Sequence, residues 1–197
     1  SSVSGSVKAI EKRENVLGTT DLSIVVVNDG QYTLAEGVGT EVDPTTLTTQ
    51  EILAKVKAAG IVGLGGAGFP THVKLAPKDP AAIKYVIANG AECEPYITCD
   101  DQLMRNYADE IVGGLKIMLQ LFPNAEGVVL IEENKPEAIA AVQKVCANEN
   151  KIHVHPVHVK YPQGGERAIM DVVAGKHIKL GMLPADVGCV VDNVATV

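Results

Sequence analysis

The stretch KYVIANGAECEPYITCDDQLMRNYADEIVGGLKIMLQLFPNAEGVVLIEEN, residues 84–134, decides the fold class. It opens with a short apolar run, 84–89, and closes with a second, 127–133, and each run is typical of a buried strand. Between them, residues 101–122 predict one long amphipathic helix. The apolar face of this helix is formed by Leu103, Tyr107, Ile111, Leu115, Met118 and Phe122. A strand, a helix and a second strand in this order form a βαβ unit with parallel strands.

The alternation continues to residue 197. A helix follows Pro136, with Asn134 as its expected cap, and residues 152–160 read as a strand. A helix over 164–175 and a strand over 187–193 complete the pattern. We therefore expect an α/β fold with a mostly parallel, Rossmann-like sheet and helices on both faces.

The segment upstream of this pattern has a different character. Residues 1–42 contain short β-like runs and an N-D-G turn at 28–30, which predicts part of a small β domain. A linker, DPTTL, leads to a helix over 48–60, where Thr48 and Glu51 fit a capping box. We expect two domains, 1–42 and 43–197.

Composition excludes several function classes. The net charge of −7 argues against a nucleic-acid surface, which needs clustered Lys and Arg. No run of 18 apolar residues is present, so no transmembrane segment is expected. The four cysteines have no C-x-x-C spacing, which favours free thiols over disulfides.

The densest local signal is the glycine loop, GIVGLGGAGFPTHVK at 60–74, with five glycines in its first nine residues. Gly63-Leu-Gly65-Gly66-Ala-Gly68 matches G-x-G-x-x-G, but the loop follows a helix rather than the strand of a dinucleotide fingerprint. Such a loop aims backbone N–H groups into one concavity, and Lys74 adds a positive charge. A ligand cradle is favoured over the alternative, a flexible connector.

Three further polar segments follow strands, where ligands of parallel sheets bind. Asn89 to Pro95, NGAECEP, offers two carboxylates and an amide for a polar ring or ribose, although a solvated turn is equally consistent with it. The other two segments are YPQGGE at 161–166 and DNVAT at 192–196. No histidine lies near these carboxylates in sequence, so no metal site is predicted.

Together, the stretches GIVGLGGAGFPTHVKL, NGAECEPYITCDDQLM, YPQGGERAI and LPADVGCVVDNVAT resemble the RnfC family, the C component of the Rnf electron-transport complex. More distantly they are similar to the NADH-oxidising flavoprotein of respiratory complex I. The resemblance covers about residues 48–197. It implies that residues 1–42 belong to a barrel-sandwich (lipoyl-like) domain preceding the flavin domain.

The resemblance also implies cofactors, FMN and NAD(H), sharing one cleft. Lys74 would meet the flavin phosphate or ring. Asn193 and Thr196 would reach the ribityl-phosphate. The remaining implied contacts are the loop glycines Gly63, Gly65, Gly66 and Gly68, the flavin and nicotinamide contacts Asn89, Glu92 and Glu94, and the nucleotide-cleft residues Tyr161, Gly164 and Glu166. No catalytic side chain is implied, because the flavin carries the chemistry.

The sequence departs from the complex I pattern at four positions. Ala91 stands in place of Asp, Gly165 and Arg167 in place of Glu and Thr, and Asp192 in place of Asn. The cysteine motifs that hold iron–sulfur clusters in the RnfC family are absent, so [4Fe-4S] clusters are expected only in a C-terminal region outside this sequence.

We therefore expect an electron-transport protein that passes electrons between NAD(H) and iron–sulfur clusters through FMN. The implied partners are the other subunits of a membrane complex, and ferredoxin indirectly, at the cytoplasmic face of the cell membrane. Two alternatives stay open: a cobalamin-reductase-like or proline-reductase-associated flavoprotein, and a scaffold module without its cofactor.

Overall fold

The computed structural model describes residues 2–197, which form two compact units that divide between Val42 and Asp43. The first unit is an antiparallel hairpin of β1 (Gly5–Glu14) and β2 (Thr20–Asn28). The Asn15 side chain closes the turn by accepting from the N–H groups of Leu17 and Thr19, at 2.9 and 3.2 Å.

The expectation of a further strand and an N-D-G hairpin in this unit is wrong. The Asn28 side chain accepts from Gly30 N at 2.8 Å, which bends the chain without pairing it, and residues 29–43 form no strand. The hairpin turn lies at Asn15 instead, where a side chain closes it.

The second unit contains a four-stranded sheet in the order β5-β4-β3-β6, and all neighbouring strands are parallel. The strands are β3 (Tyr85–Gly90), β4 (Glu126–Glu132), β5 (Ile152–Val157) and β6 (Cys189–Asn193). The burial of β3, β4 and β6 matches their apolar runs, because a parallel sheet is covered on both faces, whereas the edge strand β5 is only partly buried. The predicted α/β class is confirmed.

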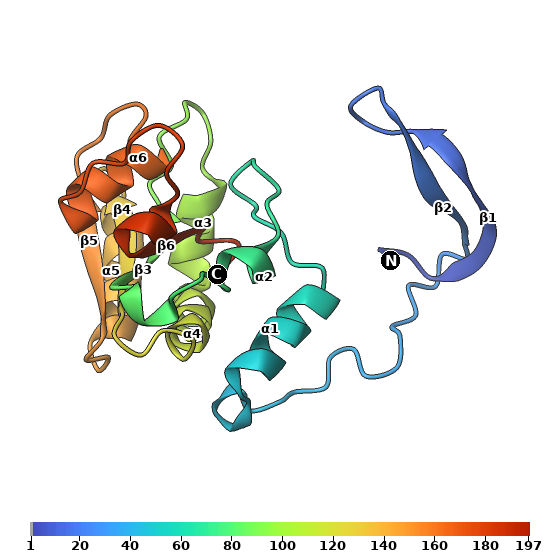
Figure 1. The fold of residues 1–197 in the computed structure, drawn as a ribbon, viewed down its shortest axis with the longest axis horizontal. Coiled ribbons are helices and arrows are strands. Elements are labelled where there is room, and N and C mark those ends of the chain that lie inside the picture. Colours follow the sequence, from blue (N-terminus) through green and yellow to red (C-terminus); the bar gives the residue numbers. More distant parts are fainter. Residues whose placement is uncertain (1) are drawn as a thin grey trace. The chain divides into compact units, whose positions relative to one another are not determined.

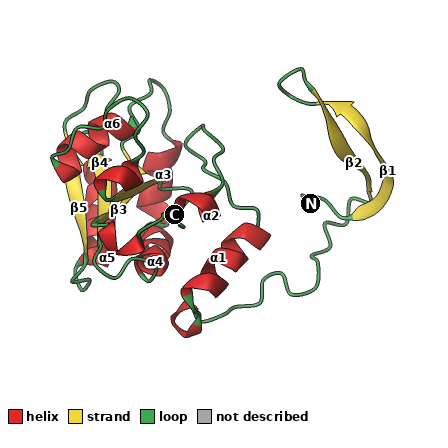
Figure 2. Ribbon diagram, in the orientation of Figure 1, coloured by secondary structure: helices red, strands yellow, loops and turns green. Residues whose placement is uncertain are grey.

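Helices cover both faces of this sheet (Figures 1 and 2). On one face, Val86 and Ala88 belong to a core shared with α3 (Cys99–Asn106), α4 (Ala108–Leu119) and α5 (Pro136–Cys146). On the other face, Ile87 packs with α6 (Glu166–Ile169) and a π-helix, η3 (Met170–Ala174). The remaining helical elements are α1 (Thr49–Ala58), α2 (Thr71–Lys74) and the 3-10 turns Pro44–Thr46, Pro80–Ala82 and Pro184–Val187.

The single helix expected over 101–122 is in fact two helices, α3 and α4. They meet at Tyr107, whose φ of −133° and ψ of 35° are not helical. The buried residues therefore differ from the predicted apolar face. Met104 and Ala108 enter the core, whereas Tyr107, which was expected on that face, is half exposed. The break lets α3 start at its own angle beside the end of β3.

Of two predicted helix caps, the structure confirms one and corrects the other. The capping box of Thr48 and Glu51 is confirmed at the start of α1, and Gly60 follows its end with a φ of +68°. The cap of α5 is Lys135 rather than Asn134, because Lys135 N donates to Glu132 O at 3.0 Å and turns the chain directly into Pro136. None of the helices within residues 2–197 has both the length and the apolar character that crossing a membrane requires.

Candidate functional site

The four parallel strands end at one edge of the sheet, and the predicted polar segments follow three of these ends. β3 ends at Gly90, β5 at Val157 and β6 at Asn193, each at or just before its motif. Segments that are far apart in sequence therefore meet at the carboxyl edge, where ligands of parallel sheets bind.

The glycine loop packs against the end of β6. Leu64 N donates to Thr196 Oγ1 at 2.9 Å, across 132 residues of sequence. A Cβ at Gly65 would lie 3.3 Å from Asn193 Cβ, so a glycine permits this close approach. The loop closes on itself through Gly63 N, which donates to Phe69 O at 2.8 Å.

The tip of the loop presents free backbone donors. Within the described chain, no acceptor takes the N–H groups of Gly65, Gly66 or Ala67. Gly66 has a φ of +108°, a conformation that other residues rarely adopt. Successive unpaired N–H groups in such a turn form a concavity that favours an anion.

Lys74 lies at the end of β6. Its ammonium donates to Val191 O at 2.6 Å and lies 3.2 Å from Asp192 Oδ1 and 3.8 Å from Glu166 Oε1. Asp192 is buried, and this burial raises the pKa of its carboxyl group, against the opposing charge of Lys74. The structure thus brings Lys74 and Glu166 together.

Asn89 joins the ends of β3 and β5. Its Nδ2 donates to Gly164 O at 3.0 Å, and its Oδ1 accepts from Ala91 N at 3.1 Å. A Cβ at Gly164 would overlap the carbonyl oxygen of Ala91, so only glycine fits this approach. The YPQGGE segment is therefore held directly against the end of β3.

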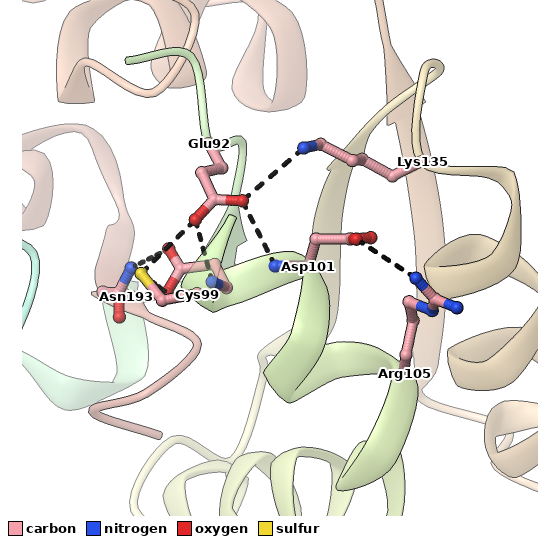
Figure 3. Close-up of polar contacts among 7 residues, drawn as sticks. Glu92, Cys99, Asp101, Arg105, Lys135 and Asn193 are labelled. Carbon is pink, nitrogen blue, oxygen red and sulfur yellow. Dashed lines mark hydrogen bonds and ion pairs between the residues drawn. The ribbon is translucent and has the colours of Figure 1, made fainter. Parts of the chain in front are cut away.

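Glu92 is buried at the start of α3 (Figure 3). Its carboxylate accepts from Asp100 N at 2.8 Å and from Asp101 N at 3.3 Å, which caps this helix. The Lys135 ammonium lies 3.6 Å from Glu92 Oε2, and Cys99 Sγ donates to Oε1 at 3.4 Å. These contacts already engage both oxygens of the carboxylate.

The same cluster connects to β6 through Asp100. Its Oδ2 accepts from Asn193 Nδ2 at 2.7 Å, so the ends of β3 and β6 share one polar network (Figure 3). Burial raises the pKa of Asp100, and the negative charge of Glu92 adds to the effect.

Glu92, Cys99 and Asp100 place ligand atoms within 4.8 Å of one another, as metal ligands do. Lys135 and two backbone N–H groups already neutralise Glu92, and we assign no metal to this cluster.

Two predicted residues stand apart from these contacts. Glu94 and Tyr161 are exposed, and among residues 2–197 no polar contact joins their side chains to the other candidates. Conversely, sequence reasoning missed Asp100, Lys135 and the burial of Asp192. The signal for Asp100 was available, because two acidic residues in the first turn of a helix follow the NGAECEP segment.

Neither of the described cavities lies at the glycine loop. One of about 640 Å³ lies at the amino edge of the sheet, between α4 and the start of β5, and one of about 270 Å³ lies at the carboxyl end of β5, where Gln163 of the YPQGGE segment lines it. Neither is lined by any predicted site residue. The candidate site is an open edge of loops and strand ends rather than an enclosed pocket.

Comparisons with known proteins agree with this geometry. The Nuo51 FMN-binding domain matches residues 56–197. The C component of the Na(+)-translocating ferredoxin:NAD(+) oxidoreductase complex of Acetobacterium woodii is 41% identical over 195 residues, which are 99% of this chain and 44% of that protein. The C component of the proton-translocating complex of Clostridium ljungdahlii is 42% identical over 174 residues, 88% of this chain and 38% of that protein.

Among solved structures, an air-oxidised NAD+-reducing [NiFe]-hydrogenase superposes with a TM-score of 0.63 at 25% identity. The match covers 78% of this chain and 29% of that one. The resemblance to the RnfC family and the expected fold class are thereby confirmed. The chain spans less than half the length of the two curated relatives.

Proposed function

The chain belongs to the family of Nuo51 FMN-binding domains, and we propose that its unit 43–197 holds FMN at the carboxyl edge of the sheet. The FMN would lie between the glycine loop and the end of β6. When bound, it would accept a hydride from NADH and release electrons singly to iron–sulfur clusters.

One observation carries this proposal: the glycine loop contacts the end of β6 while keeping its tip donors free. Leu64 N is bound to Thr196 Oγ1 at 2.9 Å, which fixes the loop. The N–H groups of Gly65, Gly66 and Ala67 have no acceptor in the described chain and suit a phosphate.

The residues present fit the rest of the cofactor. Lys74 supplies a positive charge beside the loop, and Asn193 and Thr196 supply polar groups for the ribityl chain. Asn89 and Glu166 lie at the ends of neighbouring segments, where they would border the nucleotide. Glu92 would support the site indirectly, by capping α3 and holding Lys135.

We infer the wider role from the relatives, which are longer than this chain. The names of the relatives support an electron-transport protein that works with other subunits of a membrane complex and, indirectly, with ferredoxin. We place it on the cytoplasmic face of the membrane, with iron–sulfur clusters outside residues 1–197. Residues 1–42 would be part of a barrel-sandwich domain.

A flavin titration tests the binding claim. FMN added to the purified protein should lose fluorescence saturably, because binding places the ring against protein groups. Lys74→Ala should weaken binding by removing the charge, whereas Lys116→Ala removes a lysine of the amino edge and should not. Gly66→Val should weaken binding, but Gly181→Val, an equally open position with a φ of +86°, should not.

The outcomes separate the alternatives. Saturable quenching followed by anaerobic bleaching with NADH supports electron entry through the flavin. Quenching without bleaching favours a flavoprotein with another reductant, of the cobalamin-reductase-like kind. If neither this chain nor the full-length protein quenches the fluorescence of FMN, the result favours a scaffold without cofactor and contradicts the proposal.

A further inference from the structure

Asp192, at the end of β6, is a buried carboxylate with an unusual lack of partners. It is 2% exposed, and its Oδ2 has no hydrogen-bond partner among the described residues. Its one polar neighbour is the Lys74 ammonium, 3.2 Å from Oδ1, while Oδ2 faces no donor in the described chain. Buried polar groups are ordinarily hydrogen-bonded, so this arrangement needs an explanation.

A purely structural ion pair explains it poorly. Taking two charges out of water is repaid only where further hydrogen bonds satisfy the remaining lone pairs. Lys74 has such a bond, to Val191 O at 2.6 Å, but Oδ2 of Asp192 has none. If Asp192 had only a structural role, a neutral amide or an apolar side chain could fill the same place with a smaller desolvation penalty.

The surroundings form a graded path from solvent to this carboxylate. The side chains of Glu166, Lys74 and Asp192 are 51%, 25% and 1% exposed. Lys74 Nζ lies 3.8 Å from Glu166 Oε1 and 3.2 Å from Asp192 Oδ1. An exposed carboxylate, a half-buried ammonium and a buried carboxylate therefore follow one another.

Burial and the neighbouring charges act on the pKa of Asp192 in opposite directions. Burial raises its pKa, the positive charge of Lys74 on α2 opposes this, and the negative charge of Glu166 on α6 adds to it. A further negative charge nearby would favour the protonated form again, since like charges disfavour ionisation.

We propose that Asp192 takes up a proton when the cofactor in this cradle becomes negatively charged, with Lys74 and Glu166 connecting it to solvent. The proposal rests on the proposed function, in which FMN receives two electrons from NADH beside these residues. Lys74 would pass a proton to a carboxylate oxygen of Asp192, and the ionised Glu166 would then take a proton from water and pass it to the neutral Lys74 amine. The electrons stay on the cofactor, and the protein gains one proton.

Asp192 is a positioning and proton-holding residue in this account, and its effect is therefore measured as a proton count. The midpoint potential of the FMN-loaded protein is determined by redox titration at several pH values. Each proton taken up per two electrons lowers the potential by about 30 mV per pH unit. The wild-type protein should take up one more proton per two electrons than Asp192→Asn does.

Two controls sharpen the comparison. Glu149→Gln removes a carboxylate at the amino edge, where it pairs with Lys116, and should keep the wild-type proton count. Glu166→Gln should slow proton uptake after a pH jump, because Glu166 conducts the proton between water and Lys74.

Spectroscopy covers the case in which Asp192→Asn fails to fold or to bind FMN. Infrared difference spectra of the wild-type protein should show a protonated carboxyl band on reduction. The proposal is overturned if FMN binds and neither that band nor a difference in proton count is found, while the proposed function stands. Absence of FMN binding to the full-length protein overturns both.

Discussion

Tyr96 has a backbone conformation that is strained for a residue other than glycine. It follows Glu94 and Pro95 beyond the end of β3, is fully exposed, and has a φ of +67°. The left-handed conformation costs a non-glycine residue about 1–2 kcal/mol. No burial of the ring offsets this cost within the described chain.

Tyr96→Gly should therefore stabilise the fold. The relief of strain exceeds the backbone entropy that glycine adds, about 0.5–1 kcal/mol, so the gain should be up to about 1 kcal/mol. The comparison variant is Tyr107→Gly, where φ is −133° and glycine relieves no strain but adds its entropic cost and loses the half-buried ring. Urea unfolding of the variants measures both changes, and equal losses in the two would contradict this account.

The reactivity of Cys99 depends on Glu92. The hydrogen bond to the Glu92 carboxylate, with burial and nearby negative charge, raises the pKa of the Cys99 thiol. Less thiolate is present at neutral pH, which slows alkylation. Glu92→Gln keeps an acceptor but removes the charge, and should speed reaction with iodoacetamide.

Mass spectrometry of the labelled protein identifies the site of that reaction. The buried thiols Cys146 and Cys189 should stay unlabelled in the folded protein, since burial raises the pKa of Cys189 to about 11. An unchanged rate at Cys99 in Glu92→Gln would show that the carboxylate does not control it.

At the scale of elements, the adjacent glycines of α4 have opposite roles. A Cβ at Gly113 would meet nothing within 4 Å, whereas one at Gly114 would overlap the backbone of Val197. Gly113→Ala should raise stability by about 1 kcal/mol through helix propensity. Gly114→Ala should lower it, because the segment after β6 must move away from the helix.

Thermal unfolding of the two variants measures this contrast. Gly114→Ala should also weaken FMN binding, since the displaced segment carries Thr196, which holds Leu64. A stabilised Gly114→Ala variant would mean that this segment does not rest on α4.

The elements were predictable where one local signal decided them, and not where packing did. The apolar runs of β3 and β4 and the capping box at Thr48 are local, and the structure has all three. The break at Tyr107 is not local, because the apolar periodicity runs through it. Met104 and Ala108, on either side of the break, are both buried, and the Met104 sulfur lies near Gly90 at the end of β3.

At the scale of the whole molecule, strand order creates the site. β6 is last in sequence but pairs with β3, the first strand of its sheet, so the residues after β6 meet the loop before β3. The parallel pattern alone predicts that the polar segments gather at one edge. It does not predict which segments touch, or that Asp192 is buried, because these follow from strand order.

The carboxyl edge should also govern the response of stability to pH. Burial raises the pKa of Glu132, Asp100 and Asp192 in the folded protein. The folded state then binds more protons than the unfolded state, so stability falls as pH rises from the unfolded toward the folded pKa.

Glu132→Gln should remove the part of this pH-dependent loss of stability that comes from Glu132. The variant should be more stable than the wild-type protein at neutral pH, and the difference should vanish below the ordinary glutamate pKa of 4.5. Urea unfolding from pH 4 to 8 measures it. If the stability difference between Glu132→Gln and the wild-type protein does not change with pH, burial of the carboxyl group is not its cause.

The most direct test of where FMN binds is amide chemical-shift mapping of the 20.7 kDa protein during an FMN titration. The account predicts saturable shifts for the amides of Gly65, Gly66 and Ala67 and for Asn193, with those of Lys116 and Glu149 unchanged. Shifts confined to the amino edge, or none at the glycine loop while FMN binds, would contradict it.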